Sequence, residues 1–468
     1  MDLRSLLRRK AMSHPSVLAV TVPGATELRL ELEAEVCRRG WPLAGAPAAA
    51  DLLVVCGFPA PQDAQWLDAV ERSMPEPAVR IRVQQGGQVA DALDTARREL
   101  IARALDPHRA EEQEPGNRAD AGHEGHHDEH GPGAHHDTSR SDTSGDQGSH
   151  GHHGMDHHHG DQAPESGHED HADHEPADRA AHVDRMDHQG HGGAMAHVGH
   201  DMHAMGDVAG LRMAERGDDR DRLRLDQLHV PLGPALADWP TGLILRLTLQ
   251  GDVVQGVEVD HLSVPFGDRL PFWDEPWLRA ARGEEVSRGT AARRRCAAHL
   301  DGAGRLLAVV GWDDVAARCR RLRDELLSGA PSEAIRGALR KTVRRVGKSR
   351  SLRWSLAGLG ALPADRAQAA GVTGPALAAD GDACDRLLTW LTEIERGQEE
   401  LDDIRPVAWD DRTGPRGRLD GPKAPSQALL DVLPELLTGA EFACARIILA
   451  SLDPDIEELA PVSGAAHA

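Results

Sequence analysis

Histidines and carboxylates crowd one segment of the chain, and their spacing favours metal binding. Residues 108–208 hold 22 of the 27 histidines, with acidic residues one or two positions away. Imidazole suits nickel, zinc and copper, and four methionines towards the end of the segment would also accept Cu(I). The candidate ligands are the clustered histidines His123, His126, His127, His130, His152, His153, His157, His158, His159, His197, His200 and His203.

The composition of this segment predicts disorder rather than a fixed metal site. Residues 109–207 carry 22 Asp and Glu against 5 Arg and no Lys, a charge of -17, and residues 108–208 contain no Leu, Ile or aromatic residue other than His. Such a chain cannot bury enough apolar surface to offset its conformational entropy. Two interpretations stay open: a loose buffer for Ni, Zn or Cu with several sites, or a solvated acidic linker that binds metal only incidentally.

The totals place limits on the class of protein. A chain of 468 residues has room for two or three domains. Its net charge is -23, and because most of this charge lies in the histidine-rich segment, the rest is only mildly acidic, which argues against nucleic acid as a partner. Six cysteines are scattered without a CxxC pair and read as buried thiols. No apolar run reaches the roughly 20 residues of a spanning helix. We expect a cytoplasmic protein without a direct membrane span.

Two regions show the periodicity of folded domains, and they flank the histidine-rich segment. Residues 1–107 alternate short apolar runs with helical repeats, at residues 16–22, 26–38, 51–57, 65–74 and 79–83. This alternation predicts a small α/β domain with a parallel sheet. Residues 209–468 begin with a β-hairpin and continue as helices, at residues 243–249, 253–257, 313–328, 383–404, 427–437 and 440–451. The predicted fold is therefore an α/β lobe and a mainly α lobe with an N-terminal hairpin, joined by a disordered linker at 108–208.

A basic run lies inside the second region. Residues 336–353 contain eight Arg and Lys and no acidic residue, in a stretch with helical periodicity. A solvated helix face explains this run, and so does contact with an acidic partner subunit or with anionic lipid headgroups. A role in nucleic-acid binding is disfavoured, because Trp354 is the one aromatic residue nearby.

Both regions resemble one known assembly. In the first, the strand at 51–57 followed by Met74, Pro75, Glu76 and Pro77 is similar to the small core subunit of complex I and membrane-bound hydrogenases. In the second, Gly233 and Pro234 before the hairpin resemble the start of the large core subunit. Further similar blocks follow in the family's order, at 358–362, 371–375, 424–426, 433–437 and 448–454. The resemblance implies two core-subunit-like lobes of the NADH-quinone oxidoreductase and hydrogenase superfamily, fused through the linker.

The residues that bind cofactors in that family are missing here. The small subunit holds a four-iron cluster with cysteines, and its first pair should fall near Gly24, yet no Cys stands there and none follows Pro77 in the lobe. Nickel-iron members carry one CxxC early and another at the end, where this chain reads Asp-Pro-Asp-Ile-Glu-Glu at 453–458. Neither an iron–sulfur cluster nor a nickel–iron centre is expected.

The quinone site of complex I members is also altered. There a His in a GPQHP-like loop and a Tyr hold the headgroup. Here the loop reads Gly-Pro-Ala-Leu-Ala-Asp-Trp at 233–239, and the chain has no Tyr. Asp238 and Trp239 are the weak candidates for a substitute.

Three functions therefore stay open. The favoured one is a docking or structural subunit of a complex I-like or hydrogenase-like membrane assembly, with degenerate redox sites. Its partners would be membrane proton-translocating subunits, and it would lie peripheral to the cytoplasmic membrane. The alternatives are a metal-handling protein that uses the histidine-rich segment and an active subunit that passes electrons to quinone. The sequence leaves open whether the chain is an enzyme.

Overall fold

Three parallel strands form the centre of the first lobe. The computed structural model describes residues 9–105, 213–218, 224–264 and 269–460. Strands β1 (Val17–Thr21), β2 (Leu52–Cys56) and β3 (Val79–Val83) pair in the order β1-β2-β3 with one constant register. All five residues of β2 are buried, because β2 is the central strand and both faces of the sheet are covered.

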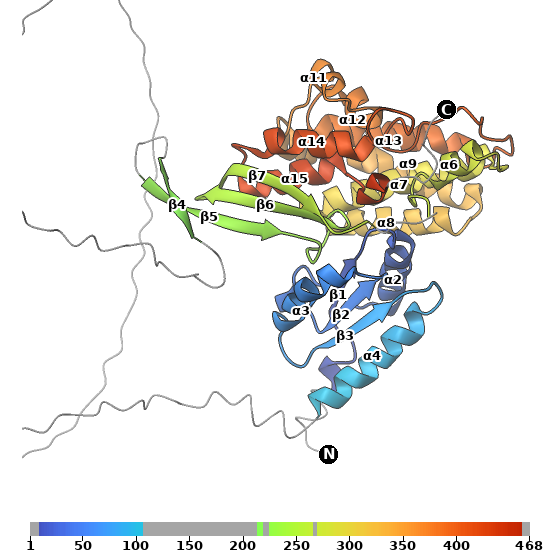
Figure 1. The fold of residues 1–468 in the computed structure, drawn as a ribbon. Helices are drawn as coiled ribbons and strands as arrows, with labels where there is room; N and C mark the ends of the chain where they lie inside the picture. The colour runs from blue at the N-terminus through green and yellow to red at the C-terminus, as the bar shows by residue number, and fades with distance from the viewer. Residues whose placement is uncertain (1–8, 106–212, 219–223, 265–268, 461–468) are drawn as a thin grey trace, which may run out of the picture. The chain divides into compact units, whose positions relative to one another are not determined.

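Helices lie on both faces of this sheet (Figure 1). Alternate strand residues point to opposite faces. Helices α2 (Thr26–Arg39) and α4 (Val89–Ala104) pack on the face that includes Val17 and Val54. Helix α3 (Ala64–Arg72) packs on the other face, against Leu18 and Leu53. The Glu76–Pro77 peptide before β3 is cis. The predicted α/β lobe with a parallel sheet is confirmed.

The second lobe begins with four antiparallel strands. These are β4 (Met213–Asp218), β5 (Arg224–Leu232), β6 (Leu243–Gln250) and β7 (Val253–His261), paired in chain order. The predicted hairpin is β6–β7, turned at Gly251 with a positive φ, and it is longer than the sequence indicated. In β6 the alternating residues Leu243, Leu245 and Leu247 are buried under the C-terminal helices, which explains why this strand was predictable.

The rest of this lobe is helical, as expected. The helices are α6 (Glu275–Ala281), α7 (Arg288–Val309), α8 (Asp313–Leu327), α9 (Ser332–Gly347), α10 (Arg350–Leu356), α11 (Ala364–Ala369), α12 (Gly374–Ala379), α13 (Ala383–Glu400), α14 (Pro425–Leu437) and α15 (Phe442–Leu452). A short 3-10 turn at Ile456–Leu459 follows α15.

Helix α7 is the central helix of this lobe and contacts α8, α13 and α15. It is rich in Ala and Gly, whose small side chains let neighbouring segments of the protein approach closely. A Cβ on Gly289 would lie only 2.7 Å from the backbone oxygen of Leu401. None of the described helices is both long and apolar enough to cross a membrane. The histidine-rich segment lies outside the described residues, and with it all twelve candidate metal ligands and the predicted linker.

Candidate functional site

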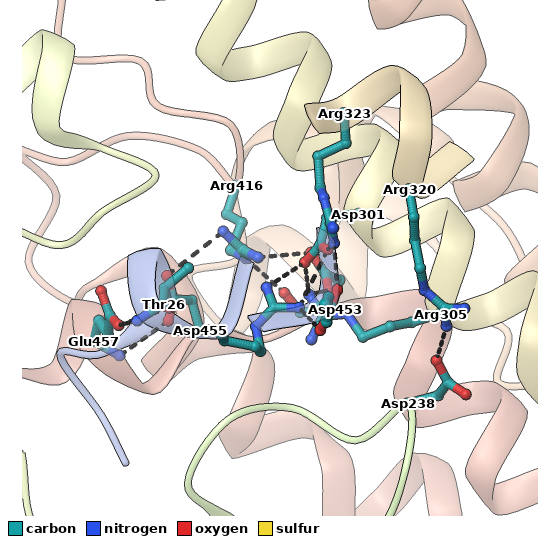
Figure 2. A network of polar contacts seen from close by, with 12 residues as sticks. Thr26, Asp238, Asp301, Arg305, Arg320, Arg323, Arg416, Asp453, Asp455 and Glu457 are labelled. Atoms are coloured by element: carbon teal, nitrogen blue, oxygen red, sulfur yellow. Dashed lines mark hydrogen bonds and ion pairs between the residues drawn. The ribbon is translucent and has the colours of Figure 1, made fainter. Parts of the chain in front are cut away.

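The carboxylate of Glu457 joins the 3-10 turn of the second lobe to the start of helix α2. Its Oε1 atom accepts hydrogen bonds from the backbone N–H groups of Gly24 and Thr26, at 3.0 and 3.1 Å, and from the Thr26 hydroxyl at 2.7 Å (Figure 2). Its Oε2 atom accepts the backbone N–H of Phe272 at 3.0 Å. The N-terminus of a helix has free N–H groups and a positive dipole end, which together favour an anion. Glu457 supplies that anion.

A buried ionic cluster connects α2 with α7 and α8. Arg29 lies 2.8 Å from Asp301, and Arg323 lies 2.7 Å from Glu33 and 2.6 Å from Asp301. Burial alone would raise the pKa of Glu33, but Arg29 and Arg323 outweigh it and lower the pKa to about 2. Against the same burial, Arg29, Arg305 and Arg323 hold the pKa of Asp301 well below its usual value. Both carboxylates are therefore ionised, and each charge has a partner from the other lobe.

Two further arginines extend the cluster to the end of α15. Arg305 lies 3.0 Å from Asp301 and 2.6 Å from Asp453. Arg416 donates to the Asp453 carboxylate and to its backbone oxygen, both at 2.6 Å. Asp453 ends α15 in the left-handed conformation, with φ 50°, and lies over Gly302 of α7. A Cβ on Gly302 would come within 3.1 Å of that carboxylate, which would have to move by a few tenths of an ångström to admit it.

A second group of carboxylates lies on the other side of Arg416. Its Nη1 atom is 3.8 Å from Asp455 and 3.9 Å from Glu458. Burial raises the pKa of Asp455 to about 7 and also raises that of Glu458. Asp274 is 1% exposed, and burial together with the nearby Glu458 raises its pKa well above the usual value. Carboxyl groups that are this close together and buried away from water share protons, so they do not all ionise.

The residues at these positions do not fit the cofactors of the family that the sequence resembles. Asp455 and Glu458 are separated by two residues, as the cysteines of a CxxC pair are, but Arg416 supplies the nearby positive charge. The loop at Gly24, where cluster cysteines were expected, is bound by Glu457. Within the described ranges no three His, Cys, Asp or Glu side chains are arranged to hold a metal ion.

The six cysteines are free and lie apart from one another. Cys56, Cys296 and Cys319 are buried, and burial raises the pKa of each to about 12, so these are inert thiols. Cys37 is exposed on α2. The expectation of buried thiols is therefore confirmed for Cys56, Cys296 and Cys319 but is wrong for Cys37, and Cys384 and Cys444 are partly exposed.

Asp238 and Trp239, the two weak candidates for a quinone site, line a cavity of about 530 Å³ between the lobes. Residues of β1 and α2, the loop before β6, and helices α7 and α8 form its walls. Asp238 has a positive φ of 57° and forms an ion pair with Arg320 of α8 (Figure 2). Burial raises the pKa of Asp238, and Arg320 opposes this shift. The Trp239 indole donates to the backbone oxygen of Leu243 at 2.8 Å. Charged residues of the ionic cluster, among them Arg29, Glu33, Asp301, Arg305 and Arg323, also line the cavity, beside apolar residues such as Trp41 and Leu43.

Sequence reasoning missed the polar network itself. Glu457, Arg416 and Asp274 were not singled out, because their partners lie far away in the chain. Asp301 did leave a signal, since it is a lone acidic residue within the Ala- and Leu-rich stretch that became α7. A buried carboxylate on a largely buried helix needs a partner, so Asp301 could have been predicted to be paired.

Comparison with known proteins gave similarities to solved structures. No family model matches the chain, and no curated protein does. The fold is similar to a chain in the solved structure of the membrane-bound sulfane sulfur reductase (MBS), an archaeal respiratory membrane complex. The two chains share 16% sequence identity with a TM-score of 0.38, and the similarity covers 49% of this chain and 98% of that one.

Proposed function

We propose that this protein is a docking or structural subunit of a complex I-like or hydrogenase-like membrane oxidoreductase, in which paired charges have replaced the redox cofactors. In this proposal the two lobes correspond to small and large core subunits, residues 1–107 and 209–468, fused through 108–208. The resemblance in sequence supports the choice of family. The polar network between the lobes supports the loss of redox chemistry.

The observation that carries the proposal is the placement of Glu457. In the family's small subunit, a four-iron cluster with its thiolates would place negative charge near this helix N-terminus. A carboxylate such as Glu457 can accept hydrogen bonds from the same N–H groups, but it cannot transfer electrons. Arg416 has the corresponding role for the carboxylates at the end of the large lobe, because it places one positive charge near Asp453, Asp455 and Glu458. Such exchanges preserve the contact between the lobes while removing the electron path.

Native gel electrophoresis of gently solubilised membranes tests this proposal. We expect the chain to migrate within a large complex that also contains polytopic proton-translocating subunits, identified by mass spectrometry. We expect the isolated complex to reduce no acceptor through this subunit. A chain that migrates alone, or with metal-transport proteins only, would contradict the docking role.

The cavity at Asp238 favours a second candidate, a subunit that binds quinone. Its volume of about 530 Å³ is large enough for a quinone headgroup, Trp41 and Trp239 offer apolar contacts, and the arginines of the lining offer donors for the carbonyl oxygens. A short-chain quinone analogue, titrated by equilibrium dialysis, tests this candidate. Ala317 is exposed and lines the cavity, so Ala317→Trp should block binding, whereas Ala334→Trp on the exposed face of α9 should not. No difference between these variants would remove the second candidate.

A further inference from the structure

One face of helix α9 carries an unusual density of positive charge. Between Glu333 and Asp365 the chain contains eight basic residues and no acidic one, although the whole chain has a net charge of -23. The apolar residues Ile335, Leu339 and Val343 of α9 are buried in the helical core. The basic residues therefore project from the opposite, solvent-facing side.

Most of these cations have no partner in the described part of the chain. Arg336 pairs with Asp402 and Arg345 pairs with Asp314, at 3.1 and 2.9 Å. The structure assigns no acceptor within residues 9–105, 213–218, 224–264 or 269–460 to the other exposed basic residues of this face, which are Arg340, Lys341, Arg344 and Lys348. Unpaired like charges on one helix repel each other, so this face gains stability when it meets an anion.

The geometry of this face suits a flat, repeating anionic surface. Positions 340, 341, 344 and 348 recur at three- and four-residue steps, which makes one stripe along the helix. These side chains, together with Gly337 and Arg345, line a shallow hollow of about 510 Å³. No side chain covers Gly337, and a Cβ there would meet nothing within 4 Å. The hollow is large enough to receive a phosphate group between several cations.

An exposed tryptophan follows the stripe. Trp354 of α10 is 85% exposed, and tryptophan is favoured at the interface between lipid and water. A nucleic acid would need a series of aromatic platforms for its bases, and this face offers one ring. An acidic protein surface would account for the charges but gives no role to a fully exposed indole.

We infer that the basic face of α9, defined by Arg340, Lys341, Arg344 and Lys348, is a docking surface for anionic phospholipid headgroups. This surface would hold the second lobe directly against a membrane, beyond any contact through partner subunits. Each Lys or Arg near an anionic bilayer contributes roughly a fivefold increase in partitioning, and three together roughly a hundredfold.

Co-sedimentation of the full chain with vesicles tests this inference. Phosphatidylglycerol–phosphatidylcholine vesicles should bind the protein at low salt, phosphatidylcholine vesicles should not, and about 0.5 M salt should release it. The triple variant Arg340→Gln, Lys341→Gln, Arg344→Gln should bind roughly a hundredfold more weakly. The matched control is Arg72→Gln, Arg82→Gln, Arg98→Gln, which removes the same charge from exposed positions of the first lobe and should leave binding nearly unchanged.

Each other outcome overturns the inference. If the wild-type chain does not bind anionic vesicles, repulsion by its net negative charge outweighs attraction by the basic face. The face would then bind an acidic protein instead. Equal loss in both triple variants would mean that only total charge matters. Equal binding to neutral vesicles would point to an apolar contact elsewhere. Circular dichroism melting should be the same for all variants, because none of the substituted side chains is buried.

Discussion

Replacing Glu457 by glutamine should weaken the contact between the lobes while leaving each lobe folded. The amide has nearly the shape of the carboxylate but only one oxygen. If that oxygen faces Gly24 and Thr26, the amide N–H group meets the N–H of Phe272, and one buried donor loses its acceptor. The three remaining bonds change from a charged to a neutral acceptor.

The structure allows the size of this effect to be worked out. An unsatisfied buried donor costs about 1–3 kcal/mol, and each hydrogen bond to a neutral rather than a charged acceptor is weaker by about 1 kcal/mol. Because these terms do not add fully, we expect a loss of about 3–5 kcal/mol. This corresponds to association between the lobes that is weaker by between about a hundredfold and a few thousandfold.

The assay uses a full chain with a specific protease site inserted between residues 108 and 208 and cut after folding. Analytical ultracentrifugation over a dilution series then measures how tightly the two fragments associate. We expect wild-type fragments to stay paired at micromolar concentration and the Glu457→Gln fragments to separate. Dissociation of the wild type at that concentration would refute the fused-lobe interpretation.

A matched control separates loss of contact from loss of folding. Asp382 also accepts backbone N–H groups, from Gly358, Cys384 and Asp385, but all of them belong to the second lobe. Asp382→Asn should lower the melting temperature of that lobe without changing association of the fragments. If the two variants behave alike, Glu457 has no special role at the contact.

Three further predictions concern protons and metals. Burial raises the pKa of Asp455 to about 7, above its value of about 3.9 in an unfolded chain, so this carboxyl lowers the free energy of unfolding as pH rises from about 4 to 7. Urea unfolding should therefore show that the stability of Asp455→Asn increases relative to that of the wild type across this range. A difference that does not change with pH would contradict this prediction. The purified protein should be colourless with background iron and acid-labile sulfide, and a stoichiometric four-iron cluster after anaerobic reconstitution would overturn the cofactor-free interpretation. Calorimetry should show several Ni²⁺ or Zn²⁺ ions bound per chain, with affinity falling between about pH 7.5 and 5.5 because imidazole must be neutral to bind. Deleting residues 120–205 should abolish this binding without changing the melting of the lobes, whereas retained tight binding would place the site in a folded lobe.

Much of the fold could be predicted because it depends on local patterns. Strand β2 is a continuous apolar run, and α13 repeats its apolar residues at helical spacing, so both were found to within a few residues. Strands β4 and β5 were missed. The first of them, Met213–Asp218, has mostly polar and small residues, and the second includes Pro231, which weakens the strand signal.

The site was less predictable because its contacts join distant segments. The run at 453–458 has four acidic residues in six and reads locally as an exposed end, yet Asp453, Asp455 and Glu457 are buried. Asp453 and Asp455 can be buried because Arg305 and Arg416 bring counter-charges from elsewhere in the chain, and Glu457 because it accepts hydrogen bonds from Gly24, Thr26 and Phe272. The sequence showed that the family's cysteines are absent, but it did not show that ion pairs and hydrogen bonds of Arg416 and Glu457 occupy these positions.

The hydrogen bonds between Thr26 and Glu457 also limit when the two lobes can complete their contact during synthesis. The two residues are 431 positions apart, so at synthesis rates of about 5–20 residues per second α2 waits roughly 20–90 s for its acceptor. During that time the N–H groups at the start of α2 are open to water. The segment that carries Glu457 is therefore made long after the helix that it caps, and a chain truncated shortly before Glu457 would present the quality-control machinery with two lobes that lack this contact.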